Sequence, residues 1–453
     1  MDLITGVPGL IAILICIRRG PERAFLNVYL PVLLLIPDGY RWSITGHLTF
    51  SETAIIPIAV FCIVHSWSDW KWTFTDYLLL ALSALMAISE GLNKNFYEGR
   101  NVALEMTCTA IMPYMLGKLL LRREAISIAA ARRIALLMTV VAISGLYEFK
   151  MGVNPYNRTL LWFFPWNVVW VTTFRYGFAR VAGPFSHAIL AGIMLVAAYR
   201  IVKWLDWTNA WPGNVPLLPI SKVRFCELSI IAGSIMTFCR GPWIGAAAAT
   251  LVIAMCRSRN RRLMVPAILF VTLLAGVPAY LKFKAYVSVG FDQAATLSQQ
   301  TAVYRRELID QYSVVAEQSP IIGYGRNNFP ALAGLPSVDN YYLLLALEHG
   351  FIAAGLLILI LSTMLVRLLI FGVRRPRDDP AAALAFTVMG VSIAIAVAIA
   401  TVYLGLQTAP FLFLVIGWGE GVLSSGGLVG AMPAAEARKV IRATNFRFQR
   451  VMA

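Results

Sequence analysis

Residues 341–371 read YYLLLALEHGFIAAGLLILILSTMLVRLLIF. A helix needs about 20 mainly apolar residues to cross the hydrocarbon core of a bilayer, and this segment exceeds that length. Lipid offers no hydrogen bonds, so a chain that crosses it must pair its backbone groups internally, as a helix does. The segment therefore predicts a helix that spans a membrane.

Comparable apolar segments recur from one end of the chain to the other. They lie near residues 3–17, 24–36, 49–65, 75–90, 102–121, 134–148, 181–201, 225–238, 242–256, 263–280, 341–371, 381–404 and 407–424. Some of these are short, so about 12–13 transmembrane helices are predicted and the side of the N-terminus stays open. The fold class that follows is an all-α polytopic membrane protein.

The composition leads to the same class. Of the 453 residues, 59% are hydrophobic and 14% are charged, whereas a soluble domain has about 45–50% apolar and about 25% charged residues. The surplus apolar surface has to face lipid, which excludes a soluble enzyme, a nucleic-acid-binding protein and a secreted disulfide scaffold. The net charge of +16 is typical of a fixed orientation and of contact with anionic lipid, so bilayer lipids are expected partners.

The basic residues of the loops predict how the chain is oriented. If the loop at 18–23 is cytoplasmic, most of the 39 Lys and Arg residues fall on the cytoplasmic side, as the positive-inside rule requires. Five parts are then distinguished: N-terminal helices at 1–180, helices that carry Arg240 at 181–280, a long outer loop at 281–340, C-terminal helices at 341–424 and a basic cytoplasmic tail at 425–453.

The outer loop at 281–340 is the longest segment that does not span the membrane. Between residues 301 and 318 its apolar residues recur at helical spacing, and Pro320 predicts where that helix ends. Long loops of this kind are commonly functional, so an ordered and functional amphipathic helix is expected. A second outer segment, 149–180, has an aromatic run at 162–166, and an interfacial aromatic belt is its simpler interpretation.

The sequence lacks the motifs of common soluble enzymes, including the P-loop, G-x-S-x-G and H-E-x-x-H. Its four histidines are scattered, so neither a metal site nor a cofactor is predicted. What remains is a group of polar residues on the outer side: Arg175, Arg180, Ser186, His187, Arg240, Arg305, Arg306, Arg326, Asp339, Asn340, Glu348 and His349. Any chemistry is expected among these residues.

Several of these residues allow two interpretations. Arg240 stands between two apolar runs, where it could snorkel to the interface or hold an anion through its planar guanidinium. Arg305 and Arg306 could form a solvated helix face or part of an anion site. His187 is either a structural hydrogen-bonding residue or a catalyst. Asp339 could cap the helix that follows it, act as a base over the outer leaflet, or do both.

Four motifs in this order resemble the O-antigen ligase and O-antigen polymerase superfamily of bacterial inner-membrane proteins. They are GPFSH at 183–187, CRG at 239–241, the loop that runs from YR at 304–305 to SPIIGYGRNNF at 319–329, and VDNYYLLLALEHG at 338–350. The resemblance implies a glycosyltransferase-C-like fold. It also implies a metal-independent, multi-pass enzyme whose active site faces the periplasm.

The resemblance implies a reaction and roles for individual residues. The enzyme would transfer a glycan from an undecaprenyl-diphosphate carrier to an acceptor hydroxyl, with other polysaccharide export proteins as further partners. Arg240 and Arg305 match arginines of the family and are assigned to the diphosphate, and Asp339 is assigned as the base. Substrate-binding roles go to Arg306, Arg326, His187 and Asn340.

Asp339 departs from the family pattern, because ligases have a histidine at this position. The departure favours a polymerase of an exported polysaccharide, either exopolysaccharide or O-antigen, over a ligase that transfers glycan to the lipid A core. A secondary transporter or flippase is the alternative from another class. Transporters carry inverted repeats and ionisable residues near the bilayer midplane, whereas here the ionisable residues gather at the outer boundary.

Overall fold

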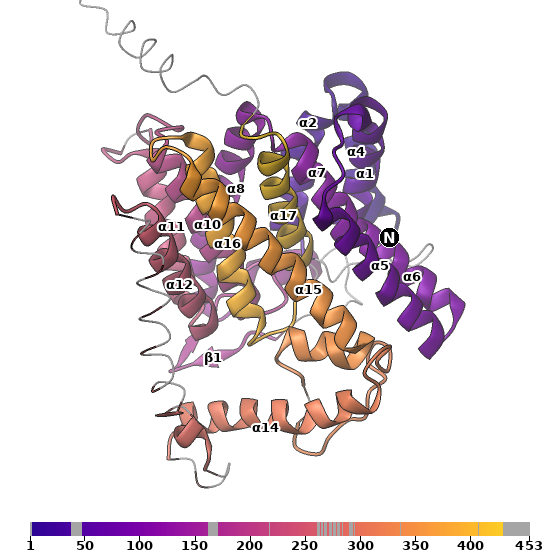
Figure 1. Ribbon diagram of the computed structural model, residues 1–453. Coiled ribbons are helices and arrows are strands. Elements are labelled where there is room, and N and C mark those ends of the chain that lie inside the picture. Colours follow the sequence, from indigo (N-terminus) through magenta and orange to yellow (C-terminus); the bar gives the residue numbers. More distant parts are fainter. Residues whose placement is uncertain are drawn as a thin grey trace, which may run out of the picture.

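The computed structural model shows a bundle of helices with one β-hairpin (Figure 1). It describes residues 2–37, 48–161, 171–216, 218–260, 295–335, 337–405 and 407–428, together with scattered positions between 263 and 293. Three sequence predictions lie wholly or mainly outside the described residues: the span at 263–280, the aromatic run at 162–166 and the basic tail.

The elements are labelled in chain order. The first half contains η1 (Asp2–Gly6), α1 (Val7–Arg19), α2 (Pro21–Ala24), η2 (Phe25–Tyr29), α3 (Leu30–Leu35), α4 (Phe50–Ser66), η3 (Trp67–Asp69), α5 (Phe74–Asn93), α6 (Phe96–Met106), η4 (Thr107–Ile111), α7 (Met112–Leu120), α8 (Glu124–Met151) and α9 (Pro155–Leu161). The hairpin strands β1 (Phe174–Arg175) and β2 (Phe178–Ala179) follow, and then α10 (Ala188–Trp207), α11 (Lys222–Met236), α12 (Arg240–Cys256), α14 (Leu297–Gln318), α15 (Tyr341–Arg374), α16 (Pro380–Ile399) and α17 (Thr408–Ser424).

Six of the described helices are long and apolar enough to cross a membrane: α4 with η3, α5, α8, α10, α15 and α16. The shorter helices α12 and α17 are also apolar. These helices confirm the all-α polytopic class. The number of about 12–13 crossings stays a prediction, because several predicted spans are divided among shorter elements. The predicted span at 102–121, for example, is shared by α6, η4 and α7.

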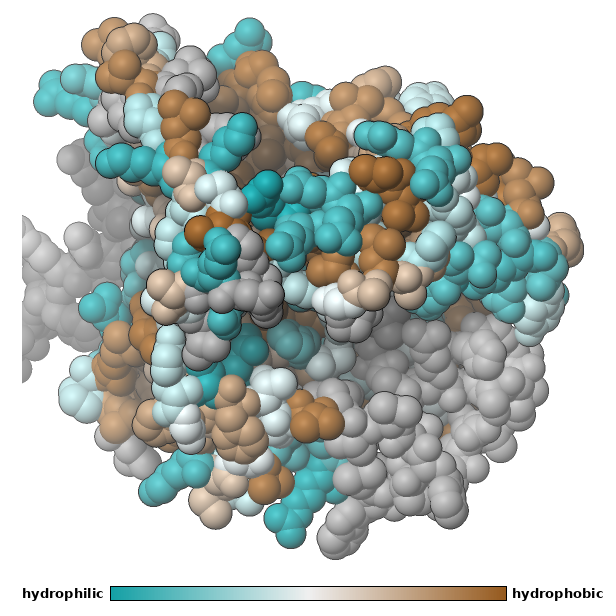
Figure 2. All heavy atoms as spheres, turned by 90° about the horizontal axis from the view of Figure 1, so that it is seen from below, coloured by the Kyte–Doolittle hydropathy of each residue, from teal (hydrophilic) through white to brown (hydrophobic). Residues whose placement is uncertain are grey.

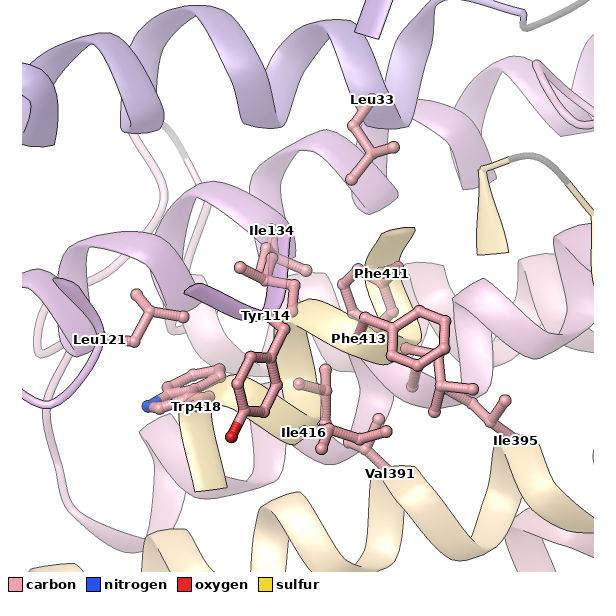
Figure 3. Packing of buried hydrophobic residues seen from close by; sticks show 14 of the residues in the cluster. Leu33, Tyr114, Leu121, Ile134, Val391, Ile395, Phe411, Phe413, Ile416 and Trp418 are labelled. Carbon is pink, nitrogen blue, oxygen red and sulfur yellow. The ribbon is translucent and has the colours of Figure 1, made fainter. Parts of the chain in front are cut away.

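Glycines let the central helices approach one another closely. A Cβ atom added to Gly417 on α17 would lie 2.0 Å from the carbonyl oxygen of Tyr114 on α7. A Cβ atom added to Gly117 on α7 would lie 2.3 Å from the carbonyl oxygen of Leu414 on α17. Such contacts between small residues are a common way to pack helices in lipid. Beside them Trp418 and other large apolar side chains fill the main core (Figure 3).

Helix α14 lies across one end of the bundle, and the β-hairpin and the first turns of α15 lie at the same end (Figure 1). We call this end the α14 face. The helix predicted at 301–318 is confirmed, since α14 ends at Gln318 as expected from Pro320. Apolar side chains of α14, including Leu308 and Tyr312, form a small cluster with residues of the following segment and of α15. This cluster is separate from the main core.

A largely buried set of charges, which was not singled out in the sequence, links helices of the bundle. Lys118 on α7 lies with its Nζ 2.6 Å from Oδ2 of Asp76 on α5, and both side chains are almost fully buried. Arg367 on α15 donates to the carboxylate of Glu420 on α17. Two acids and two bases compensate one another, so this network links four helices without leaving an unbalanced charge.

Helix α15 departs from helical geometry at Gly350 (φ 84°, ψ 165°). The backbone groups around this break find partners in the segment that follows α14. The carbonyl of Leu347 accepts from the N–H of Tyr324 at 2.9 Å, and the N–H of Phe351 donates to the carbonyl of Pro320 at 2.8 Å. Buried backbone groups require such partners, so the break and the docked segment depend on each other.

Gly350→Ala is expected to lower the free energy of unfolding by more than about 2 kcal/mol. Alanine would have to adopt a positive φ, and its Cβ atom would lie 2.2 Å from the carbonyl oxygen of Ile321. Denaturant unfolding of the protein in detergent micelles measures the change. The control is Gly355→Ala on the same helix, because a Cβ atom there meets nothing within 4 Å. Equal effects of the two substitutions would contradict the steric explanation.

Candidate functional site

A tight β-hairpin brings two arginines to the α14 face. Its strands pair in antiparallel register, and the two residues of the turn, Tyr176 and Gly177, have positive φ values of 55° and 82°. Positive φ at both positions is typical of the two-residue turns that match the twist of paired strands. Arg175 lies in the hairpin, and Arg180 directly follows it.

Both arginines bind the break between α11 and α12. Arg175 donates from Nη1 to the carbonyl oxygen of Phe238 at 2.8 Å, and Arg180 donates from Nε to the carbonyl oxygen of Thr237 at 3.2 Å. Cations are favoured here because the last carbonyls of a helix carry partial negative charge. Arg240, which is exposed, follows as the first residue of α12. Three arginines therefore gather at this break.

Arg305 on α14 joins this group. Its half-buried guanidinium interacts electrostatically with Asp339 and with Arg175. Burial lowers the pKa of Arg305, while the carboxylate of Asp339 acts in the opposite direction. An arginine nevertheless stays protonated at any working pH. The structure thus places Arg175 and Asp339, which are distant in the sequence, within electrostatic range of Arg305.

Asp339 does not cap α15. The cap is Asn340, whose Oδ1 accepts from two backbone N–H groups of the first turn at 3.0 and 3.2 Å. The capping interpretation of Asp339 is therefore wrong, and a substrate-binding role for Asn340 stays a prediction. Asp339 instead accepts from the hydroxyl of Ser337 at 3.3 Å. Burial raises the pKa of Asp339 above its usual value, although Arg305 and Ser337 act to lower it.

His187 caps a different helix. Its Nδ1 accepts from the backbone N–H of Ile189 at 3.1 Å, at the start of α10. This bond places the proton of the neutral imidazole on Nε2. Burial and, after it, the nearby charge of Arg180 lower the pKa of His187 to about 4, so the ring is neutral near pH 7. The capping bond occupies Nδ1, as the structural interpretation of His187 expects. A contact with the substrate would therefore have to be made by Nε2.

Arg306 and Arg326 are engaged elsewhere. Arg306 forms an exposed pair with Asp310, with 3.1 Å between Nε and Oδ2, as the solvated-face interpretation expects. Arg326 holds Glu105 on α6, with 2.6 Å between Nη1 and Oε2 and 3.2 Å between Nη2 and Oε1. A carboxylate bound in this bidentate way occupies the paired N–H donors of the guanidinium that would otherwise bind a phosphate. The substrate-binding roles of these two arginines stay predictions.

Glu148 on α8 holds the loop that precedes α10, and the sequence did not single it out. Its buried carboxylate accepts from the backbone N–H groups of Ala182 at 3.2 Å and Gly183 at 2.9 Å, and from the side chain of Asn154 at 2.9 Å. These bonds fix the segment that leads to His187. A charge at the end of an apolar run is commonly a snorkelling residue, so no local signal indicated this role.

The arrangement suits an anionic substrate and a proton transfer. Hydrophilic side chains form a band across the middle of the α14 face, and the surface is hollowed next to that band (Figure 2). Guanidinium groups bind phosphate oxygens through paired N–H donors, and a carboxylate with a raised pKa can accept a proton. Among the residues that the structure describes, no group of three or more His, Cys, Asp or Glu side chains is placed to hold a metal ion. The absence of a metal stays a prediction.

Comparison with known protein families gives a match for the middle of the chain. Residues 228–358 match the family model described as O-antigen ligase. The match begins within α11 and ends within α15, so it contains Arg240, Arg305 and Asp339. The two arginines of the hairpin region precede it. No curated protein matches the chain.

Proposed function

We propose that the protein is a member of the O-antigen ligase and O-antigen polymerase superfamily, as the match at residues 228–358 supports, and that it transfers a glycan from an undecaprenyl-diphosphate carrier to an acceptor hydroxyl. In this proposal the reaction takes place at the α14 face, on the periplasmic side of the bacterial inner membrane. The observation that supports this most strongly is that Arg305 lies within electrostatic range of Asp339 and Arg175, while Arg175 binds the break that precedes Arg240.

In this proposal the arginines act on the leaving group. The bond between the anomeric carbon and the diphosphate oxygen breaks, and its electron pair leaves with the diphosphate. Preorganised cations stabilise negative charge that develops in a transition state, and a guanidinium does so without losing its proton. Arg240 and Arg305 are assigned this role, and Arg175 is a further cation beside Arg305.

Asp339 takes up the proton of the acceptor. The acceptor oxygen attacks the anomeric carbon, and the hydroxyl proton passes to the carboxylate. A general base works best when its pKa lies near the working pH, and burial moves the pKa of Asp339 upward in that direction. Arg305 limits the rise, which helps to keep the carboxylate ionised at neutral pH.

The acceptor in this proposal is a second lipid-linked glycan, so that the protein polymerises an exported polysaccharide without a metal ion. Residue 339 is an aspartate where ligases of the superfamily carry histidine, which favours a polymerase over transfer to the lipid A core. Other polysaccharide export proteins are proposed as partners, because a polymer made at this face has to be passed on.

The intermediate that accumulates after deletion of the gene tests the proposal. Single lipid-linked repeats are expected if the protein is a polymerase. Finished polymer that is not attached to lipid A would indicate a ligase instead. An unchanged set of polysaccharides and lipid-linked intermediates would contradict both, and restoring the wild-type gene is the control.

A further inference from the structure

The segment that follows α14 is attached to three helices of the bundle. We call residues 319–328 the anchor segment. The backbone N–H of Arg326 donates to Oε2 of Glu90 on α5 at 2.8 Å, and the next N–H donates to Oε1 of Glu348 on α15 at 3.3 Å. The side chain of Arg326 adds its two bonds to Glu105 on α6.

The anchor segment also holds the last turns of α14. The hydroxyl of Tyr324 lies 3.2 Å from the carbonyl oxygen of Val315 and 3.3 Å from Oε1 of Gln318, both on α14. The apolar cluster beneath α14 is small and separate from the main core. The orientation of α14 over the bundle therefore depends on the anchor segment as well as on this cluster, which includes Leu343 and Leu347 of α15.

Arg305 lies on the same helix, far from the anchor segment. It lies 13 positions before Gln318, the last residue of α14, which corresponds to about 20 Å along a helix. A tilt of about 5° at the anchored end would therefore move Arg305 by about 2 Å. A misplacement of about 1 Å at a reacting centre can lower a rate by about 100-fold. Small changes in the anchor segment should thus have large effects on transfer.

The charges around Arg326 do not suit a diphosphate. Glu90, Glu105 and Glu348 surround its side chain and backbone, whereas Lys94, which pairs with Glu90 at 2.8 Å, is a second cation in this group. The three carboxylates outnumber the two cations when ionised, so an approaching diphosphate would be repelled. In addition, both terminal nitrogens of the Arg326 guanidinium already donate to the carboxylate of Glu105.

We propose that Arg326 is a positioning residue. Its ion pair with Glu105 fixes the anchor segment and thereby holds Arg305 at the site, and its own side chain does not touch the substrate. This role differs from the substrate-binding role expected from the sequence. The inference rests on the proposed glycan transfer for its kinetic readout, whereas its structural readout is independent of any reaction.

A double-mutant cycle in the purified full-length protein tests this role. Arg326→Gln leaves the carboxylate of Glu105 without its cation and is expected to lower transfer by about 10- to 100-fold. Adding Glu105→Gln removes that unpaired charge and leaves two amides that can hydrogen-bond across the same contact, so transfer is expected to return to within about threefold of the wild type. Hydrogen–deuterium exchange of the α14 amides should speed up in Arg326→Gln and return in the double variant.

Arg100→Gln is the matched control, because Arg100 is an exposed arginine on α6, the helix that carries Glu105. It should change neither transfer nor exchange. If the double variant stays as inactive as Arg326→Gln while its exchange returns to that of the wild type, Arg326 binds the substrate and the proposal is overturned. Unchanged transfer and exchange in Arg326→Gln would overturn it as well. A wild-type protein without transfer but with the expected exchange pattern would refute the proposed function and support the anchor.

Discussion

Arg305→Ala is expected to lower the rate of glycan transfer by at least about 100-fold, because loss of one preorganised group that stabilises developing charge has an effect of this size. The guanidinium is half-buried beside Asp339 and Arg175. Alanine therefore removes a cation from the place where the diphosphate is proposed to lie. Initial rates of transfer between lipid-linked glycans, catalysed by the protein in liposomes, measure the effect, and insertion into the bilayer should be unchanged.

The neighbouring arginine provides the comparison. Arg306 pairs with Asp310 on an exposed face, where an ion pair contributes little, and its Nη1 donates to the carbonyl of Val287 at 2.9 Å. Because the guanidinium is already engaged, Arg306→Ala is expected to lower transfer by less than about threefold, in contrast to the substrate-binding role expected from the sequence. Arg240→Ala should resemble Arg305→Ala, because both residues are assigned to the diphosphate. Wild-type activity in Arg305→Ala, or equal losses in the two adjacent variants, would contradict the assignment of Arg305.

Asp339→Asn is expected to lower kcat by about 100- to 10,000-fold, the usual contribution of a general base. Asparagine keeps the shape and the bond to Ser337 but cannot take up the acceptor proton. Burial raises the pKa of Asp339, so the folded protein binds this proton more tightly than the unfolded chain, and the ionised carboxylate destabilises the fold at neutral pH. The melting temperature of Asp339→Asn should therefore equal or exceed that of the wild type.

The pH dependence of transfer checks the same residue independently. The base has to be ionised, so the wild-type rate should rise with pH through the raised pKa of Asp339 and then level off. Asp339→Asn should lose this dependence together with most of its activity. A fully active Asp339→Asn variant, or a wild-type rate that falls over the same acidic range as the pH rises, would leave Asp339 without a catalytic role.

The long helices and the C-terminal end of α14 could be predicted because they depend on local patterns. Helix α14 ends at Gln318, just before Pro320, and α15 begins at Tyr341 where the apolar run begins. The break at Gly350 could not be predicted in the same way. A glycine within an apolar run has no distinctive pattern, and this one is set by contacts with the separate segment at 320–325.

Much of the candidate site depends on partners that are distant in the sequence. Arg175 contacts Phe238 across 63 residues, and Arg326 contacts Glu105 across 221 residues, so no spacing along the chain indicates either contact. The order of the motifs indicated Arg240, Arg305 and Asp339, but it could not show that Arg175 stands beside Arg305.

The cap of α15 shows a similar limit at short range. Asp339 and Asn340 are adjacent, and both residue types are favoured at the start of a helix. Asp339 would cap a helix that begins at residue 340, whereas Asn340 caps one that begins at residue 341. In the structure Asn340 provides the cap, and this leaves the carboxylate of Asp339 beside Arg305.

Glycan transfer itself can be measured in liposomes that contain the purified protein, undecaprenyl-diphosphate-linked repeats and a chelator, with no solute gradient. Both products should be quantified, the elongated glycan and the released undecaprenyl diphosphate. We expect one undecaprenyl diphosphate to be released for each new glycosidic bond with the wild type, and almost none with Arg305→Ala. Unchanged repeats in the presence of the wild-type protein, or their movement across the bilayer without new bonds, would contradict a role in glycan transfer.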